Sequence, residues 1–222
     1  MHDKRFPAET TAYRKARDQL LRAETDLMEQ TWKVAAQRAA LPAGGEVPTD
    51  YVFEAAGGKK VKLSQLFQRG QDTLILYSFM YGPKMKAACP MCTSLLDGLD
   101  GQSDHVRQRV GFAVVAKNPI AKIRAHAKKR GWRRLQLLSS ARNSYNLDYF
   151  GEDAEGNQWS VLNVFSRRGG KIRHTYGTEL AFIDRGSDTC HVDTVWPLWN
   201  LFDFTPEGRG SDWYPALSYP RR

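Results

Sequence analysis

Two cysteines separated by two residues are the part of this chain best equipped for chemistry. Cys89 and Cys92 enclose Pro90 and Met91 in the sequence Cys-Pro-Met-Cys. A thiolate is a strong nucleophile, and a second thiol one helical turn away can attack the mixed disulfide that the first one forms. The spacing therefore predicts a redox pair in which Cys89 is the attacking thiolate and Cys92 is the resolving thiol.

The flanking residues predict how this pair is held. Residues 73–80 are apolar and aromatic over the length of a strand, which indicates a strand buried on both faces. Gly82 and Pro83 interrupt this run. Because Pro90 is tolerated only in the first turn of a helix, we expect Cys89 at or just before a helix N-terminus. The free N–H groups and the helix dipole at such a position stabilise a thiolate.

Two other interpretations of the cysteines stay open at this point. A structural zinc site needs four ligands, and Cys190 with His191 would complete a Cys3His set, although the chain has no second Cys-x-x-Cys. Alternatively, the cysteines are inert thiols packed in a core. Cys190 follows the pair at a distance in a polar stretch, and we expect it to be dispensable for disulfide reduction. We assign no metal and no cofactor, since the sequence carries no flavin or nicotinamide motif.

Composition narrows the class of protein. The 222 residues are 41% hydrophobic and 26% charged, which is ordinary for a soluble globular domain with a core. Residues 1–10 contain no apolar segment typical of a secretion signal, and no apolar run reaches the length of a membrane span. Three cysteines do not form a disulfide framework. We therefore expect a cytoplasmic protein in a reducing compartment, with no membrane as partner.

The net charge of +9 permits contact with nucleic acid but does not require it. The densest basic stretch is residues 122–134, in which Trp132 is the only large aromatic side chain. Nucleic-acid binders usually interleave several stacking aromatics with their cations. We therefore interpret this stretch as the solvated outer face of a helix, and nucleic acid is not an expected partner.

A long helix is predicted at residues 8–40. Spacings of three and four alternate along one seam, whose members are Tyr13, Ala16, Leu20, Ala23, Leu27, Gln30 and Val34. A helix of about 30 residues is about 45 Å long, which is more than one small domain covers along its full length. This helix therefore either wraps its own domain or pairs with a second subunit.

Strands and helices alternate through the middle of the chain. Asn118 and Pro119 predict a helix start, as the N-cap and the first helical residue, and Gly131 predicts the end of that helix. The predicted strands are residues 51–53, 60–63, 73–80, 112–117 and 135–139, followed by a hairpin of residues 161–165 and 172–176. Parallel strands joined by helices and followed by a β-hairpin make the thioredoxin arrangement.

These elements predict an α/β, thioredoxin-like fold, in which helices flank a central mixed sheet. The predicted domains are an N-terminal helical extension and linker at 1–46, a thioredoxin-like domain at 47–182, and a C-terminal aromatic extension packed on it at 183–222. One departure concerns the cis-proline that thioredoxin folds usually place before the first hairpin strand, facing the cysteines. Ser160 or Val161 stands there instead, which weakens the docking of a substrate peptide.

The C-terminal tail is unusually aromatic. Its members are Trp196, Trp199, Phe202, Phe204, Trp213, Tyr214 and Tyr219. Aromatic side chains mostly serve cores, so we expect this tail to pack over its own sheet. A ligand pocket or a dimer interface is the alternative.

Several segments together resemble a known family. They are FPAETTAYRKARDQLL, LPAGGEVPTDYVFE, YSFMYGP with CPMCTSLLDGLDG, VVAKNPIAKIRAHAKKRGW, LLSSARNSYNLDYFGED and WPLWNLFDFTPEGRG. They resemble a bacterial family of thioredoxin-like proteins of unknown function, whose members are often described as predicted dithiol-disulfide oxidoreductases. The resemblance covers nearly the whole chain. It implies a thioredoxin fold with an N-terminal helical extension, and Cys89 and Cys92 as the redox pair, but no particular substrate.

The sequence therefore predicts a thiol-disulfide oxidoreductase of thioredoxin type that uses Cys89 and Cys92. The expected partners are a disulfide-containing protein or small-molecule substrate, a cellular thiol reductant and a second copy of the chain. A thiol peroxidase variant belongs to the same class. The alternative is a thioredoxin-fold binding module without turnover that holds zinc or a small ligand.

The long helix generates a prediction of a homodimer. An exposed seam on it, together with the aromatic tail, makes a larger apolar surface than soluble monomers usually carry, and a two-fold dimer buries such a surface. Light scattering is expected to give about twice the chain mass of 25.2 kDa. A single-chain mass that persists on concentrating the sample contradicts the dimer. A dimer that survives deletion of residues 1–40 contradicts the role of the helix.

Overall fold

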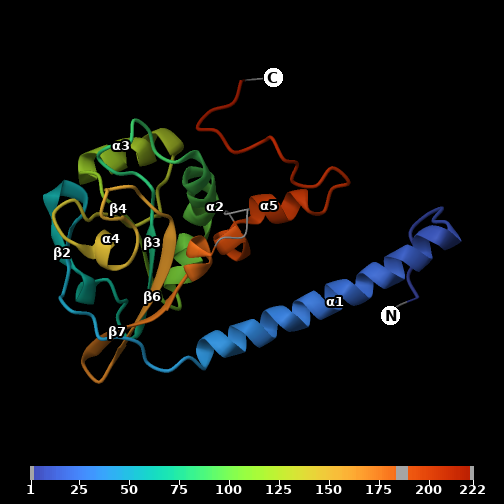
Figure 1. The fold of residues 1–222 in the computed structure, drawn as a ribbon, viewed down its shortest axis with the longest axis horizontal. Helices are drawn as coiled ribbons and strands as arrows, with labels where there is room; N and C mark the ends of the chain where they lie inside the picture. Colours follow the sequence, from blue (N-terminus) through green and yellow to red (C-terminus); the bar gives the residue numbers. More distant parts are fainter. Residues whose placement is uncertain (1–2, 184–189, 221–222) are drawn as a thin grey trace. The chain divides into compact units, whose positions relative to one another are not determined.

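The computed structural model describes residues 3–183 and 190–220, apart from the side chains of residues 181, 190 and 191 (Figure 1). The described chain forms two compact units, residues 1–42 and residues 43–222. Within the described residues, not one helix combines the length and the apolar character that crossing a bilayer takes.

The N-terminal unit is built on α1 (Thr11–Ala39), which confirms the predicted long helix. Thr10 caps it by accepting a hydrogen bond from the backbone N–H of Tyr13. No residue of α1 is buried, and the seam residues Leu20 and Leu27 are 52% and 68% exposed. The helix therefore presents its apolar seam without a partner in this unit.

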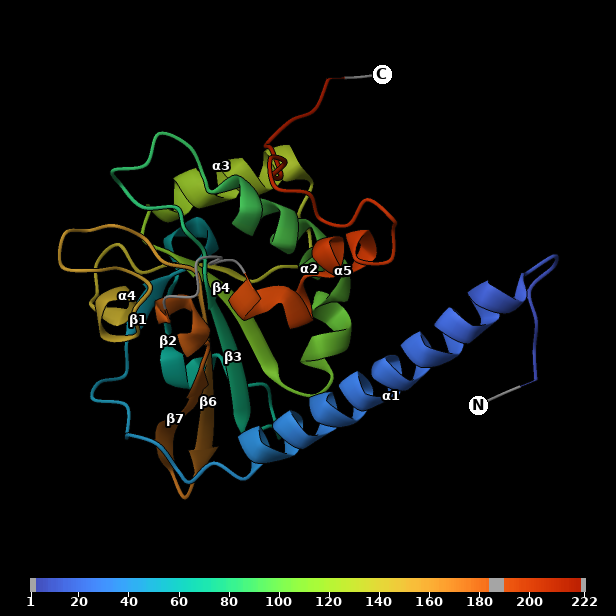
Figure 2. The same cartoon turned by 45° about the vertical axis from the view of Figure 1, so that its right-hand side comes forward.

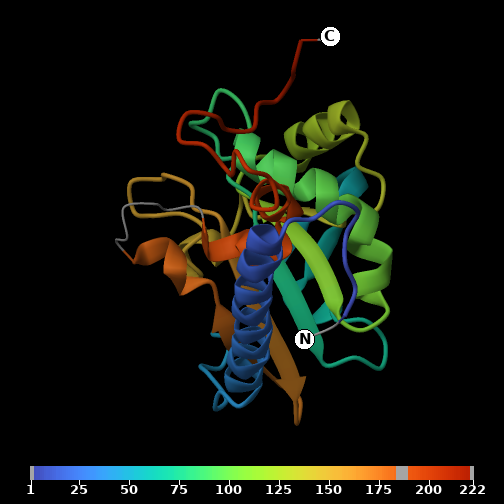
Figure 3. The ribbon, with the colours of Figure 1, turned by 90° about the vertical axis from the view of Figure 1, so that its right-hand side faces the viewer.

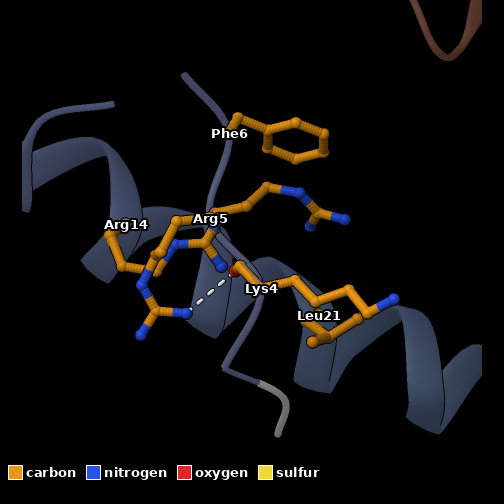
Figure 4. A pocket seen from close by; sticks show the side chains of 6 residues that line it. Lys4, Arg5, Phe6, Arg14 and Leu21 are labelled. Carbon is orange, nitrogen blue, oxygen red and sulfur yellow. Dashed lines mark hydrogen bonds between the residues drawn. The ribbon is translucent and has the colours of Figure 1, made fainter. Parts of the chain in front are cut away.

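The residues before α1 fold back over its first turns. Figure 4 shows the resulting pocket of about 350 Å³, in which Arg5 donates a hydrogen bond to the carbonyl of Lys4. Arg14 binds the carboxylates of Glu9 and Asp18, at 2.8 and 3.2 Å. The remaining lining side chains are Phe6, Arg17 and Leu21. The Arg14–Glu9 ion pair thus holds this short segment against the helix.

The second unit contains a seven-stranded sheet in the order β2-β1-β5-β4-β3-β6-β7. The central strand β3 pairs in parallel with β4, and β4 pairs in parallel with β5. Figure 3 shows β3 in teal beside β4 in light green. The hairpin of β6 and β7 pairs antiparallel with β3. The strands are β1 (Val52–Glu54), β2 (Lys60–Lys62), β3 (Thr73–Ser78), β4 (Gly111–Ala116), β5 (Leu137–Ser139), β6 (Val161–Arg168) and β7 (Lys171–Gly177).

Helices connect and cover these strands. The two parallel crossovers run through α2 and α3, both of which pack on one face of the sheet. The α-helices are α2 (Pro90–Arg107), α3 (Ile120–Arg130), α4 (Tyr145–Asp148) and α5 (Pro197–Phe202). Short 3-10 helices are η1 (Ala56–Gly58), η2 (Leu63–Gln65), η3 (Glu179–Phe182) and η4 (Cys190–Val195).

The central strand β3 is buried on both faces, as its apolar sequence predicts. Because side chains alternate along a strand, Tyr77 lies in the cluster with α2 and α3, while Leu74 and Leu76 lie in the cluster on the opposite face. There they pack with Phe53 and with Tyr145 of α4. The strand that precedes the cysteines is therefore held by packing on both of its faces.

The predicted start of α3 is wrong by one residue. The helix begins at Ile120 with Pro119 as its N-cap, so Asn118 lies outside it. Asn118 is buried, and its side chain donates a hydrogen bond to the carbonyl of Gly82. This contact with the loop before the cysteines replaces the local cap that the sequence favours. Gly131 ends the helix in the left-handed conformation, as predicted.

The aromatic tail packs partly into the core of the same unit. Trp196 and Trp199 are buried in the cluster that includes Leu95 of α2. The indole of Trp196 donates to the hydroxyl of Ser94 at 3.4 Å. Figure 2 shows α5 in red-orange beside α2 in green. The tail thus covers the helix that carries the cysteines.

The segment after α1, which includes the end of the predicted N-terminal extension and linker at 1–46, is partly structured. The backbone N–H of Val47 donates to the carbonyl of Ile172, and that of His174 donates to the carbonyl of Gly45. A side chain at Gly44 would meet the carbonyl oxygen of His174 at 2.0 Å, so only glycine allows this approach. Residues 44–47 therefore cover the outer edge of β7.

The order and directions of the strands confirm the predicted α/β, thioredoxin-like fold. The strand pairings define a βαβαβ unit, formed by β3, β4 and β5 with their connecting helices, and a hairpin that pairs with β3. The cysteine pair stands at the start of the first crossover helix.

A pair of glycine substitutions tests this packing. A Cβ added at Gly111, where β4 begins, would meet the carbonyl oxygen of Leu66 at 2.6 Å, so Gly111→Ala is expected to lower the free energy of unfolding by about 1–3 kcal/mol. Gly101 in α2 has open space around it, so Gly101→Ala is expected to raise it by about 0.5–1 kcal/mol. Urea denaturation measures both. Equal effects of the two substitutions contradict the close packing of Gly111.

Candidate active site

The structure places Cys89 at the N-cap of α2 and Cys92 one turn into the helix. The Cys89 sulfur accepts a hydrogen bond from the backbone N–H of Cys92 at 3.4 Å. The backbone N–H of Cys89 donates to the carbonyl of Met80 at 3.1 Å, which ties the cysteine to the end of the buried strand. Both cysteines are free thiols. Cys89 is half-buried, whereas Cys92 is only 4% exposed.

The two sulfurs share a proton unequally. The pKa of Cys89 is lowered to about 6, first by the hydrogen bond from the Cys92 thiol and then by the backbone N–H groups of Cys92 and Met91, against an opposing effect of burial. The pKa of Cys92 is raised well above its ordinary value by the same hydrogen bond, by burial and by the charge on Cys89. At neutral pH the pair therefore consists of a Cys89 thiolate and a protonated Cys92.

Tyr77 is a third member of the site that sequence reasoning missed. It lies on β3 beneath α2, fully buried, and its hydroxyl is within hydrogen-bonding reach of Cys92 and Ser160. Burial is the main reason why its pKa is raised, and the negative charge near the two cysteines adds to this effect. The one signal in the sequence was a residue with a polar tip inside an otherwise apolar strand.

The loop that leads to Cys89 is fixed by Asn118. The backbone N–H of Asn118 donates to the carbonyl of Tyr81 at 3.1 Å, and its side-chain amide donates to the carbonyl of Gly82 at 3.0 Å. The hydroxyl of Ser139 in turn donates to the carbonyl of Asn118 at 2.6 Å. The ends of β4 and β5 thus hold the loop that positions the Cys89 sulfur.

His126 reaches the same helix turn through Thr93. The Thr93 hydroxyl donates to the carbonyl of Cys89 at 2.8 Å and lies 3.2 Å from Nε2 of His126. Because that hydroxyl hydrogen is already used, Nε2 of His126 must carry the proton and donate it. Burial is the main cause that lowers the pKa of His126, and Arg130 adds to it, so the ring is neutral near pH 7. Sequence reasoning did not identify this residue.

The segment that replaces the cis-proline lies beside the pair. None of the described peptide bonds is cis, and Ser160 approaches the hydroxyl of Tyr77. Gln158 is buried under the redox loop, where a Cβ on Gly82 would meet its side chain at 2.6 Å. Ser160 therefore occupies the place near the cysteines that its sequence position predicts.

The structure gives no support to a metal centre within its described part. No three His, Cys, Asp or Glu side chains gather there. The side chains of Cys190 and His191 lie outside the described residues, so the Cys3His alternative stays a hypothesis. Cys89 and Cys92 alone supply two of the four ligands of a closed zinc site.

Residues 3–221 match the model of a family described as "Bacterial protein of unknown function (DUF899)". The chain belongs to this family. The resemblance seen in the sequence motifs is thereby confirmed. The match to the DUF899 model extends over both structural units of this chain. A comparison with curated proteins gives no sequence match.

Solved structures with similar chains are peroxiredoxin-type proteins. Peroxidoxin BcpB from Mycobacterium tuberculosis is 16% identical, with a TM-score of 0.47 over 70% of this chain and 94% of its own. The bacterioferritin comigratory protein of Xanthomonas campestris is 12% identical, with a TM-score of 0.48 over 70% and 95%. Thioredoxin peroxidase I of Plasmodium yoelii is 17% identical, with a TM-score of 0.45 over 71% and 88%. The assignment of the fold of this DUF899 member rests on its own strand order and connections.

The pKa of Cys89 predicts a pH profile. Because only the thiolate is alkylated, the rate at Cys89 is expected to rise with pH to a plateau, with a midpoint near 6, while Cys92 stays unreactive over that range. Iodoacetamide labelling with peptide mass spectrometry measures each cysteine separately. Cys89→Ser is the control that removes the low-pH phase. Equal rates at both residues, with the midpoint of an ordinary thiol, contradict the assignment.

Proposed function

We propose that this protein is a thiol-disulfide oxidoreductase of thioredoxin type, with Cys89 as the attacking thiolate and Cys92 as the resolving thiol. The observation that carries the proposal is the asymmetry of the pair. Cys89 stands at a helix N-terminus with a lowered pKa, and Cys92 lies buried beneath it with a raised one. An accessible thiolate backed by a protected thiol is what a two-step disulfide exchange requires.

Reduction of a substrate disulfide would proceed in two displacements. The Cys89 thiolate attacks one substrate sulfur, forming a mixed disulfide and releasing the other sulfur as a thiolate. Cys92 then loses its proton and attacks the Cys89 sulfur, which releases the second substrate thiolate. The substrate gains two electrons, and Cys89 and Cys92 end as a disulfide. A thiol reductant of the cell restores the dithiol by the reverse exchange.

Tyr77 is suited to assist the second displacement. When Cys89 is bound in the mixed disulfide, it carries no negative charge, and the hydrogen bond that held the Cys92 proton is lost. The Tyr77 hydroxyl then lies beside the Cys92 sulfur, together with the backbone N–H of Met80. It can donate a hydrogen bond to the Cys92 thiolate as that thiolate forms, in a site from which water is largely excluded.

The partners and the location follow as parts of the proposal. The substrate is a disulfide-containing protein or small molecule, the reductant is a cellular thiol, and the compartment is the cytoplasm. We propose that the homodimer forms through α1, because its seam residues are exposed. Two aromatic side chains of the C-terminal tail do not contribute to the dimer interface, because Trp196 and Trp199 are already buried within their own unit.

Turnover of a model disulfide tests the redox proposal. Wild type with excess dithiol is expected to reduce the disulfide catalytically, and Cys89→Ser is expected to lose turnover because the nucleophile is gone. Cys92→Ser is expected to accumulate a mixed disulfide on Cys89, visible as an added mass. Tyr77→Phe is expected to retain rapid formation of the mixed disulfide and to slow its resolution.

Two controls separate this proposal from the alternatives. Cys190→Ser removes a thiol outside the pair and is expected to turn over normally. Metal analysis of protein purified without added metal is expected to find no zinc on the pair, whereas one equivalent of zinc and no turnover would favour the binding module. Wild-type turnover that persists in Cys89→Ser contradicts the proposed mechanism.

A further inference from the structure

A groove of about 910 Å³ lies on the second unit between η1 and α3, with β5 along its floor. Its larger apolar lining residues come from α3, β5 and the segment between them, and are Ile120, Trp132, Leu135 and Leu137; alanines of α3 and of residues 55–56 complete the apolar lining. None of these residues belongs to the cysteine site, and the redox mechanism makes no use of the groove. Its shape suits an extended ligand, because α3 runs along it and residues 135–137 lie opposite.

The floor of the groove includes one main-chain position of β5, Leu137, that β1 leaves unpaired, although β5 lies between β1 and β4 in the sheet. β1 pairs with β5 at a single position, Glu54 with Ser139. On the other side, the carbonyl of Gln136 accepts from the N–H of Val114 in β4. Main-chain groups of successive residues in a strand point to opposite sides. The N–H and carbonyl of Leu137 therefore point toward the groove, where β1 has no residue opposite them.

The chain that would have paired with Leu137 turns away from it. After Glu54, residues 55–58 leave the sheet and form η1. Gly57 and Gly58 have φ angles of +68° and +75°, a left-handed conformation that glycine adopts without strain. This turn shortens β1 to three residues, so the pairing of β1 with β5 stops at Ser139 and does not reach Leu137.

The walls of the groove carry positive charge. Arg124 and Lys128 from α3 and Arg133 from the following segment line it. In the part of the chain that the structure describes, no carboxylate forms an ion pair with any of the three. Glu54 is the single acidic residue of the described lining, and Lys60 already binds it at 3.1 Å. The charge of the groove is therefore available to a ligand.

We propose that this groove binds an extended acidic segment of a partner protein, which adds a short strand beside β5. The main chain of Leu137 supplies a donor and an acceptor for strand addition, the apolar lining receives alternate side chains, and the three cations select carboxylates on the others. The proposal does not depend on the chemistry of the cysteines. It gives the protein a second recognition surface, made by α3 and β5.

Binding of a defined peptide to the full chain tests the proposal. The probe is a fluorescein-labelled dodecapeptide of alternating glutamate and valine, measured by fluorescence anisotropy at low and high salt. Saturable binding that weakens with salt is expected, and a peptide of alternating lysine and valine is expected not to bind. Absence of saturable binding at low salt overturns the proposal.

A matched pair of variants locates the binding. Lys128→Glu reverses a charge inside the groove and is expected to weaken binding about tenfold. Lys129→Glu reverses the neighbouring charge on α3, which does not line the groove, and is expected to have a much smaller effect. Equal effects of the two variants show attraction to the whole basic helix, which overturns a built groove.

Two further measurements test strand addition and the class of ligand. A peptide with N-methyl groups on alternate residues cannot donate to β5 and is expected to lose binding, and amide exchange at Leu137 is expected to slow when the unmodified peptide is bound. Unchanged binding of the methylated peptide overturns strand addition. A twelve-nucleotide oligothymidylate that binds more tightly than the acidic peptide, with the same dependence on Lys128, overturns the peptide as occupant.

Discussion

The hydrogen bonds that converge on the Cys89 sulfur are the interaction on which the rest of the site depends. They come from the Cys92 thiol and from backbone N–H groups of the first turn of α2. A helix N-terminus can serve in this way only if its first turn is held rigidly at the end of a strand. The bond from the Cys89 N–H to Met80, and those from Asn118 to the loop, provide that rigidity. The parallel pairing of β3, β4 and β5 thus fixes the loop and helix turn that hold the Cys89 sulfur in place.

Burial separates the roles of the two cysteines. Cys92 faces Tyr77 and the apolar cluster of β3 and α2, so a charge on its sulfur is costly until its proton has a destination. Cys89, one turn earlier, stands at the rim of the same cluster. A shift of three residues along a helix therefore separates a half-buried thiol with a lowered pKa from a fully buried thiol with a raised pKa. Thr93 and His126 add a second brace to the turn between them.

Periodic and local features of the chain were predictable from the sequence, and distant contacts were not. Residues 73–80 predict a buried strand, and Pro90 predicts a helix start next to Cys89. Both predictions were possible because each signal lies within a single element. The sequence predicted Asn118 as a helix cap. That prediction failed because the side chain instead binds Gly82, in a loop 36 residues away. For the same reason His126 gave no signal, and Tyr77 gave only that of a polar tip within an apolar strand. Tyr77 and His126 lie near the cysteines because of the way β3 and α3 pack against α2. A single sequence does not contain this tertiary information.

The burial of Trp199 against α2 has a consequence for how the chain is made. Trp199 follows Cys89 by about 110 residues, and it lies in the same cluster as the redox helix. At a synthesis rate of roughly 5–20 residues per second, the tail emerges about 5–20 seconds after the cysteines. Throughout that interval the nascent helix lacks its outer cover. A ribosome that stalls before residue 199 is made would therefore hold the cysteine-bearing helix without this cover.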